Sequence, residues 1–123
     1  MLTADLKAWE KNPSRYWANA PKEVGELMVS MTGPFYEGKD QIQRDEAMRS
    51  VGISAQTLML SAKALGYDSC PMIGFDQDAV GQIINLPDDH TIGMIVVVGK
   101  KTKDAFARPG QLPLKDVVIQ NSF

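Results

Sequence analysis

Residue types that could carry nucleophilic chemistry occur in the second half of this 123-residue chain. Ser69 and Cys70 are adjacent, and His90 is the single histidine. A catalytic triad needs an activated nucleophile, a base within hydrogen-bond reach and a group that orients the base. Nothing marks such a set here. We therefore interpret His90 as a solvated turn residue beside two aspartates. Cys70 has no basic neighbour in sequence to activate it, and we interpret it as a buried structural thiol.

Metal-binding and nucleotide-binding motifs are also absent from the sequence. One histidine and one cysteine cannot complete a structural zinc set, and the acidic residues are scattered. Neither Gly-x-Gly-x-x-Gly nor Gly-x-x-x-x-Gly-Lys-Ser/Thr occurs. The basic cluster of Lys100, Lys101 and Lys103 fits an exposed loop. The sequence predicts no metal site and no catalytic side chain.

The short segment formed by Pro71, Met72, Ile73 and Gly74 is the strongest candidate for contact with a ligand. It joins a predicted strand to a predicted helix. Pro71 has no N–H group, and Gly74 lets a ligand approach the main chain closely. Such a turn can direct backbone N–H groups at a planar acceptor. An ordinary strand-to-helix turn would have the same residues, so both interpretations stay open at this point.

Helical patterns fill the first half of the chain. The sequence predicts a short helix over residues 5–11 and a second helix from about residue 21, ended by Gly33-Pro34. A long helix is predicted over residues 40–65, where apolar residues recur at a helical period. Its second half is apolar on nearly all sides, which indicates that it enters a core or an interface. Gly66 suits a left-handed cap after its last turn.

Short strands dominate the second half. Residues 67–73 predict an edge strand interrupted by Pro71. Asp76 is predicted to cap a helix over residues 77–86. The β-branched run 92–98 predicts a strand buried on both faces, followed by a polar loop over residues 100–113 and a last strand over 116–119. A strand buried on both faces needs neighbours, and this chain offers few. We expect a second copy or another segment to complete the sheet.

The composition fits a single domain over residues 1–123. Hydrophobic residues make up 44 % and charged residues 23 % of the chain. The formal net charge is -2, which gives no reason to expect nucleic acid or an anionic membrane as a partner. No apolar stretch reaches the roughly 20 residues that a membrane span needs. A single cysteine excludes an intramolecular disulfide, and we expect a cytoplasmic location.

An ordered set of segments, rather than one motif, resembles the nitroreductase family over essentially the whole chain. These segments are Asp45–Ile53, Ala55–Leu60, Gly66–Asp76, Val98–Lys100 and Gln111–Val118. The resemblance implies an α+β fold with a central, mainly antiparallel sheet flanked by helices. It also implies an intimate homodimer with a long interface helix.

The same resemblance implies a flavin mononucleotide (FMN) cofactor at the dimer interface. NAD(P)H would reduce the flavin, and a nitroaromatic, a quinone or a similar small acceptor would take the electrons. Because the flavin supplies the chemistry, no catalytic side chain is required. The segment Pro71–Gly74 would pass along the isoalloxazine ring, with the N–H groups of Ile73 and Gly74 directed toward N5.

Two further sites follow from the resemblance. Arg108 would hold the FMN phosphate, helped by Lys100 or Lys103, because its forked donors suit a phosphate. Many relatives carry another basic residue where this chain has Gln111. The aromatic pair of Phe35 and Tyr36 would line the acceptor channel, with core packing as the alternative.

The front of the chain departs from the family pattern. Family members open with an arginine-rich helix and a Pro-Ser-x-x-Asn-x-Gln-Pro-Trp-like stretch that contact the flavin, and neither occurs here. We therefore expect this chain to correspond to the C-terminal portion of the family. Two functions follow: an FMN-dependent oxidoreductase, or a non-enzymatic remnant or half-module that keeps the helical dimerisation core without a working flavin site.

Overall fold

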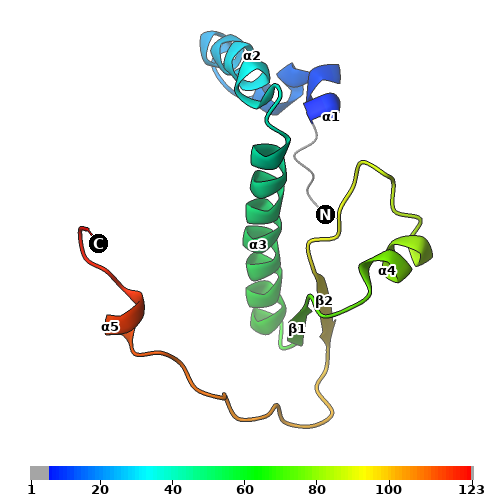
Figure 1. Ribbon diagram of the computed structural model, residues 1–123, viewed down its shortest axis with the longest axis vertical. Helices are drawn as coiled ribbons and strands as arrows, with labels where there is room; N and C mark the ends of the chain where they lie inside the picture. Colours follow the sequence, from blue (N-terminus) through cyan, green and yellow to red (C-terminus); the bar gives the residue numbers. More distant parts are fainter. Residues whose placement is uncertain (1–5, 123) are drawn as a thin grey trace.

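The computed structural model describes residues 6–122, and one long helix organises them (Figure 1). The elements in chain order are α1 (Leu6–Lys11), the 3-10 helix η1 (Pro13–Trp17), α2 (Lys22–Tyr36), α3 (Asp40–Ala64), β1 (Asp68–Met72), α4 (Gln77–Ile83), β2 (Ile95–Gly99) and α5 (Leu114–Val117). Figure 1 shows α1 and α2 at one end of α3 and the two strands at the other. The predicted start of the first helix, at residue 5, lies outside the described residues.

The helix α2 is longer than the sequence predicts. It continues through Gly33 and Pro34 to Tyr36, so the expected end at Gly33-Pro34 is wrong. Pro34 lies in the last turn, where its missing N–H removes only one intrahelical hydrogen bond. The carbonyl of Gly33 still accepts a hydrogen bond from the N–H of Glu37 at 3.0 Å. A proline this close to a helix end therefore does not stop the helix.

The helix α3 has 25 residues, which gives a length of about 37 Å. The prediction of a helix from residue 40 to 65 is confirmed to within one residue. Its end is closed by a Schellman motif. The N–H of Tyr67 donates to the carbonyl of Ala62 at 2.8 Å, and the N–H of Gly66 donates to the carbonyl of Lys63 at 3.0 Å. Gly66 has φ +78°, the left-handed conformation that the sequence predicts.

The strands β1 and β2 pair antiparallel, from Asp68 opposite Gly99 to Met72 opposite Ile95. Within residues 6–122 this pair is the whole sheet. The predicted burial of the second strand on both faces is wrong for the single chain, because 52 % of Val97 and 43 % of Val98 are exposed. No further strand of the described chain covers them.

The strand β2 begins at Ile95 rather than at residue 92, because the residues before it pack against α3. A Cβ built on Gly93 would lie 2.6 Å from Cγ1 of Val51. Ile92 is only 8 % exposed and belongs to the small buried core with Ala55 and Ala62 of α3. Gly93 thus allows this loop to lie directly on the long helix.

The last two helices differ from the prediction at their ends. Asn85, at φ +52°, closes α4 three residues before the predicted end, and the N–H of Leu86 donates to the carbonyl of Gly81 at 2.9 Å. The predicted strand over residues 116–119 is wrong. Those residues begin inside the single helical turn α5, which starts directly after Pro113.

Much of the chain's apolar surface is uncovered. The accessible surface is 10353 Å², whereas a compact protein of this mass exposes about 6,500 Å². The most exposed large apolar residues of α3, its C-cap and the C-terminal segment are Ile53, Leu60, Leu65, Phe106, Leu112 and Leu114. Among residues 6–122, no helix has the length and the apolar character to cross a bilayer.

Candidate functional site

The turn at 71–74, which comprises the last two residues of β1 and the two residues that follow, presents main chain to solvent. Pro71 and Met72 are paired with Val96 and Ile95 of β2, whereas Ile73 is 72 % exposed. No atom lies within 4 Å of a Cβ built on Gly74. Among the turn and loop hydrogen bonds of the described residues, none uses the N–H of Ile73 or of Gly74. The turn can therefore accept a ligand against its backbone.

The exit from this turn is fixed by the start of α4. The side chain of Asp76 accepts a hydrogen bond from the N–H of Ala79 at 2.9 Å, and its carbonyl accepts one from the N–H of Val80 at 3.1 Å. This confirms the predicted helix cap. The turn is thus held between a paired strand and a capped helix.

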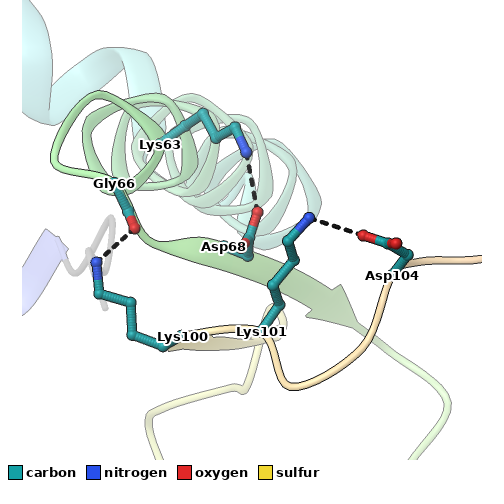
Figure 2. Close-up of polar contacts among 6 residues, drawn as sticks. All are labelled: Lys63, Gly66, Asp68, Lys100, Lys101 and Asp104. Atoms are coloured by element: carbon teal, nitrogen blue, oxygen red, sulfur yellow. Dashed lines mark hydrogen bonds and ion pairs between the residues drawn. The ribbon is translucent and has the colours of Figure 1, made fainter.

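The start of β1 is held by charged side chains from three elements (Figure 2). Nζ of Lys100, just after β2, donates to the carbonyl of Gly66 at 2.7 Å and lies 4.3 Å from the ring centroid of Tyr67. Nζ of Lys63, on α3, donates to Oδ1 of Asp68 at 2.9 Å. These contacts join the end of α3, the start of β1 and the end of β2.

The carboxyl group of Asp68 responds to this environment. The hydrogen bond from Lys63 is the largest cause that lowers its pKa below the ordinary value. Desolvation acts in the opposite direction, and the positive charges of Lys63 and Lys101 and the backbone N–H of Lys101 lower the pKa further. Asp68 is therefore an ionised acceptor that links Lys63 of α3 to Lys101, two residues after β2.

The basic residues expected at the FMN phosphate differ in whether they already have a partner in the chain. Lys100 is already bonded to Gly66, as described above. Arg108 and Lys103 are exposed and make no hydrogen bond or ion pair within residues 6–122. Both lie in the segment between β2 and α5, which extends away from α4 in Figure 1.

The aromatic pair at the end of α2 lies apart from the turn. The rings of Phe35 and Tyr36 are perpendicular, with centroids 4.8 Å apart, and Nζ of Lys39 lies 4.8 Å from the Phe35 ring centroid. Phe35 is 53 % exposed, so it is not a core residue of the single chain. The helix α3, about 37 Å long, runs between this end of α2 and the start of β1 (Figure 1).

No side-chain catalytic set forms in the described residues. Cys70 is exposed, so its interpretation as a buried thiol is wrong. The sheet has no third strand in residues 6–122 to cover it. His90 is half-buried rather than fully solvated, and its Nδ1 lies 2.6 Å from Oδ1 of Asp89. Within residues 6–122 no three metal-ligating side chains gather.

The sequence pattern did not predict the contacts at the start of β1. The acidic Asp68 follows Lys63 and the predicted cap at Gly66 closely, and that charge pattern is the signal that could have indicated them. The contact of Lys100 with Gly66, 34 residues apart, has no local signal.

Taken together, the fold and the site define an α+β protein with a long central helix and an accessible main-chain turn in place of a catalytic side-chain set. Residues 4–100 match the model of the nitroreductase family. The chain belongs to the nitroreductase family.

Sequence relatives cover nearly all of this chain. The protein DrgA of Synechocystis is 52 % identical over 119 residues, which are 93 % of this chain and 57 % of DrgA. The protein MhqN of Bacillus subtilis, named as an NAD(P)H nitroreductase, is 42 % identical over 99 residues, which are 79 % of this chain and 48 % of MhqN. The chain therefore spans about half the length of the curated relatives it matches.

Solved structures agree with this fold. The ydfN protein of Bacillus subtilis has a TM-score of 0.80 at 37 % identity, over 94 % of this chain and 59 % of that one. A nitroreductase-type protein of Exiguobacterium sibiricum, solved in complex with FMN, has a TM-score of 0.80 at 26 % identity, over 95 % of this chain and 59 % of that one.

Proposed function

We propose that this protein is an FMN-dependent oxidoreductase that passes electrons from NAD(P)H through the flavin to a nitroaromatic, a quinone or a similar small acceptor. The observation that carries the proposal is the match of residues 4–100 to the nitroreductase family. The likeness to a structure solved with FMN supports the choice of cofactor. The name of MhqN supports NAD(P)H as the electron donor.

The residues of the turn suit a flavin. An isoalloxazine ring is planar and carries hydrogen-bond acceptors along one edge. The N–H groups of Ile73 and Gly74 are free of turn and loop hydrogen bonds, and the space above Gly74 is open. When bound, the flavin supplies the hydride chemistry, and the protein positions it and tunes its electronics. Pro71 and Met72 would flank the ring, and Arg108 would pair with the phosphate through its forked donors.

We further propose that the working protein is a cytoplasmic homodimer. The chain exposes about 60 % more surface than a compact protein of its mass, and its long helix carries exposed apolar residues such as Ile53, Leu58 and Leu60. In one chain, Phe35 and Tyr36 end the helix that precedes α3, whereas the turn at 71–74 follows α3 and lies beyond its other end in the chain. In a dimer, Phe35 and Tyr36 would lie near the flavin of the partner subunit and contact the acceptor that this flavin reduces.

The test compares two glycines that both have open space around them. A leucine at Gly74 would occupy the volume where the ring is expected, whereas a leucine at Gly99, at the end of β2, would not. We expect Gly74→Leu to raise the dissociation constant for FMN by more than about tenfold and to abolish NAD(P)H-dependent quinone reduction. Gly99→Leu should leave both unchanged.

FMN uptake by the unmutated protein also distinguishes the two functions that the sequence predicts. A yellow protein that takes up FMN and oxidises NAD(P)H supports the oxidoreductase. A colourless protein that dimerises but takes up no added FMN would contradict it and favour a half-module that keeps only the dimerisation core.

A further inference from the structure

The strand β1 cannot fix the turn at 71–74 by itself. It has five residues and, within residues 6–122, one neighbouring strand. Pro71 lies inside it and has no N–H to donate to the ladder. An isolated two-stranded hairpin is marginally stable at best in water. The position of the turn must therefore depend on contacts outside the ladder.

Those contacts gather at the opposite end of β1 (Figure 2). We name them the β1 clamp and define it as Lys63, Gly66, Asp68 and Lys100. Lys100 holds the carbonyl of Gly66 at 2.7 Å, and Lys63 holds the carboxylate of Asp68 at 2.9 Å. The clamp connects both strands to α3, the longest element of the described chain.

The side chains of the clamp suit a rigid connection between the two strands and the end of α3. The carbonyl of Gly66 lies just beyond the end of α3, where the helix carries a partial negative charge. A lysine there contributes both a donor and a complementary charge. The stem of Lys100 also brings its ammonium over the ring of Tyr67, at 4.3 Å from the centroid, which adds a cation–π contact. One side chain after β2 thus contacts both the helix cap and the first residue after it.

We propose that Lys100 and Asp68 are positioning residues for the flavin site, and that Lys100 acts through β1 rather than by gripping the phosphate. This inference rests on the proposed FMN site. Loss of either side chain frees the start of β1, and the free N–H groups at the end of the same strand then lose their alignment. Loss of the clamp should therefore weaken binding of the flavin ring equally, whether or not the ligand carries a phosphate.

The experiment uses Lys100→Met, with Lys101→Met as the matched control. Lys101 is on the same loop; its ammonium forms an ion pair with Asp104 at 2.8 Å, and its charge acts on Asp68 less than the charge of Lys63 does. Binding of FMN and of riboflavin, which has no phosphate, is measured for each protein. Amide hydrogen exchange of residues 68–74 is measured without flavin. We expect Lys100→Met to weaken both ligands by the same factor, about tenfold, and to speed exchange in that segment. Lys101→Met should change neither.

A loss confined to FMN would overturn the inference, because it would place Lys100 at the phosphate. Unchanged exchange in residues 68–74 would overturn it as well. If Lys100→Met does not fold, Asp68→Asn removes the charge that Lys63 pairs with and keeps the shape of the side chain. The same increase in exchange is expected there, and its absence contradicts the inference. A wild-type protein that binds neither flavin refutes the proposed function, while exchange still tests the clamp.

Discussion

Replacing Gly93 with alanine should destabilise the protein, because the added methyl group meets the long helix. The new Cβ would lie 2.6 Å from Cγ1 of Val51 and 3.1 Å from both its Cβ and its Cγ2. Carbon atoms do not approach this closely, so the loop before β2 or the side chain of Val51 must move. The neighbouring Ile92 is 8 % exposed, and this limits how far the loop can shift.

The expected cost is about 1–3 kcal/mol of unfolding free energy, the range for overpacking a well-packed contact. For a chain of this size, 2 kcal/mol corresponds to a decrease of about 6–10 °C in melting temperature. Val51→Ala removes both γ carbons that meet the new methyl group. The double variant should therefore lose less than the sum of the two single losses, by about 1 kcal/mol or more.

Urea denaturation followed by circular dichroism, at one fixed protein concentration, measures these differences. Gly52→Ala is the matched control, because no atom lies within 4 Å of a Cβ at that position in α3. It should stabilise the protein by up to about 1 kcal/mol, since alanine favours a helix interior over glycine. If Gly93→Ala lies within about 0.5 kcal/mol of wild type, or adds to Val51→Ala without coupling, the contact with α3 is refuted.

Further predictions concern single side chains. Asp76→Ala should cost about 1 kcal/mol by removing the hydrogen bond from Ala79, whereas Asp76→Ser should keep most of it; thermal melts distinguish the two. The pKa of Asp68 is lowered in the folded protein, so its contribution to stability is present above the ordinary carboxyl value of about 4 and is lost as the pH falls through the lowered value. Asp68→Asn should flatten that acidic part of a plot of urea midpoint against pH, and an unchanged slope would contradict the role of Lys63. Leu58→Asp places a charge on the apolar half of α3, where Leu58 is 47 % exposed, and should shift sedimentation from dimer to monomer.

Local features could be predicted well from the sequence. The bounds of α3, the left-handed Gly66 and the cap at Asp76 all follow from residue types within one or two helical turns. Capping depends on a side chain and the nearest backbone groups, so a linear pattern contains what is needed. A strand-to-helix connection was predicted over 71–74 for the same reason; the structure begins it at Ile73, because Pro71 and Met72 belong to β1, and its role as a flavin site stays a prediction.

Features that depend on distant contacts could not be predicted. The exposure of Val97 and Val98 depends on which strands lie beside β2, and a β-branched run alone predicts burial whether or not those strands are present. Gly93 gives no local signal of its contact with Val51. In the sequence, Lys100 is one lysine of a basic loop. Only the folded chain places its ammonium group at the carbonyl of Gly66, just beyond the end of α3.

The most direct test of the account is an FMN titration followed by the backbone amide signals of the protein in a nitrogen-15 NMR spectrum. Main-chain binding at the turn predicts that the amide signals of Ile73 and Gly74 move most as FMN is added, and that the amide signals of residues 73 and 74 in Gly74→Leu do not move. If FMN binds while both amides keep their positions, the turn is not the flavin site.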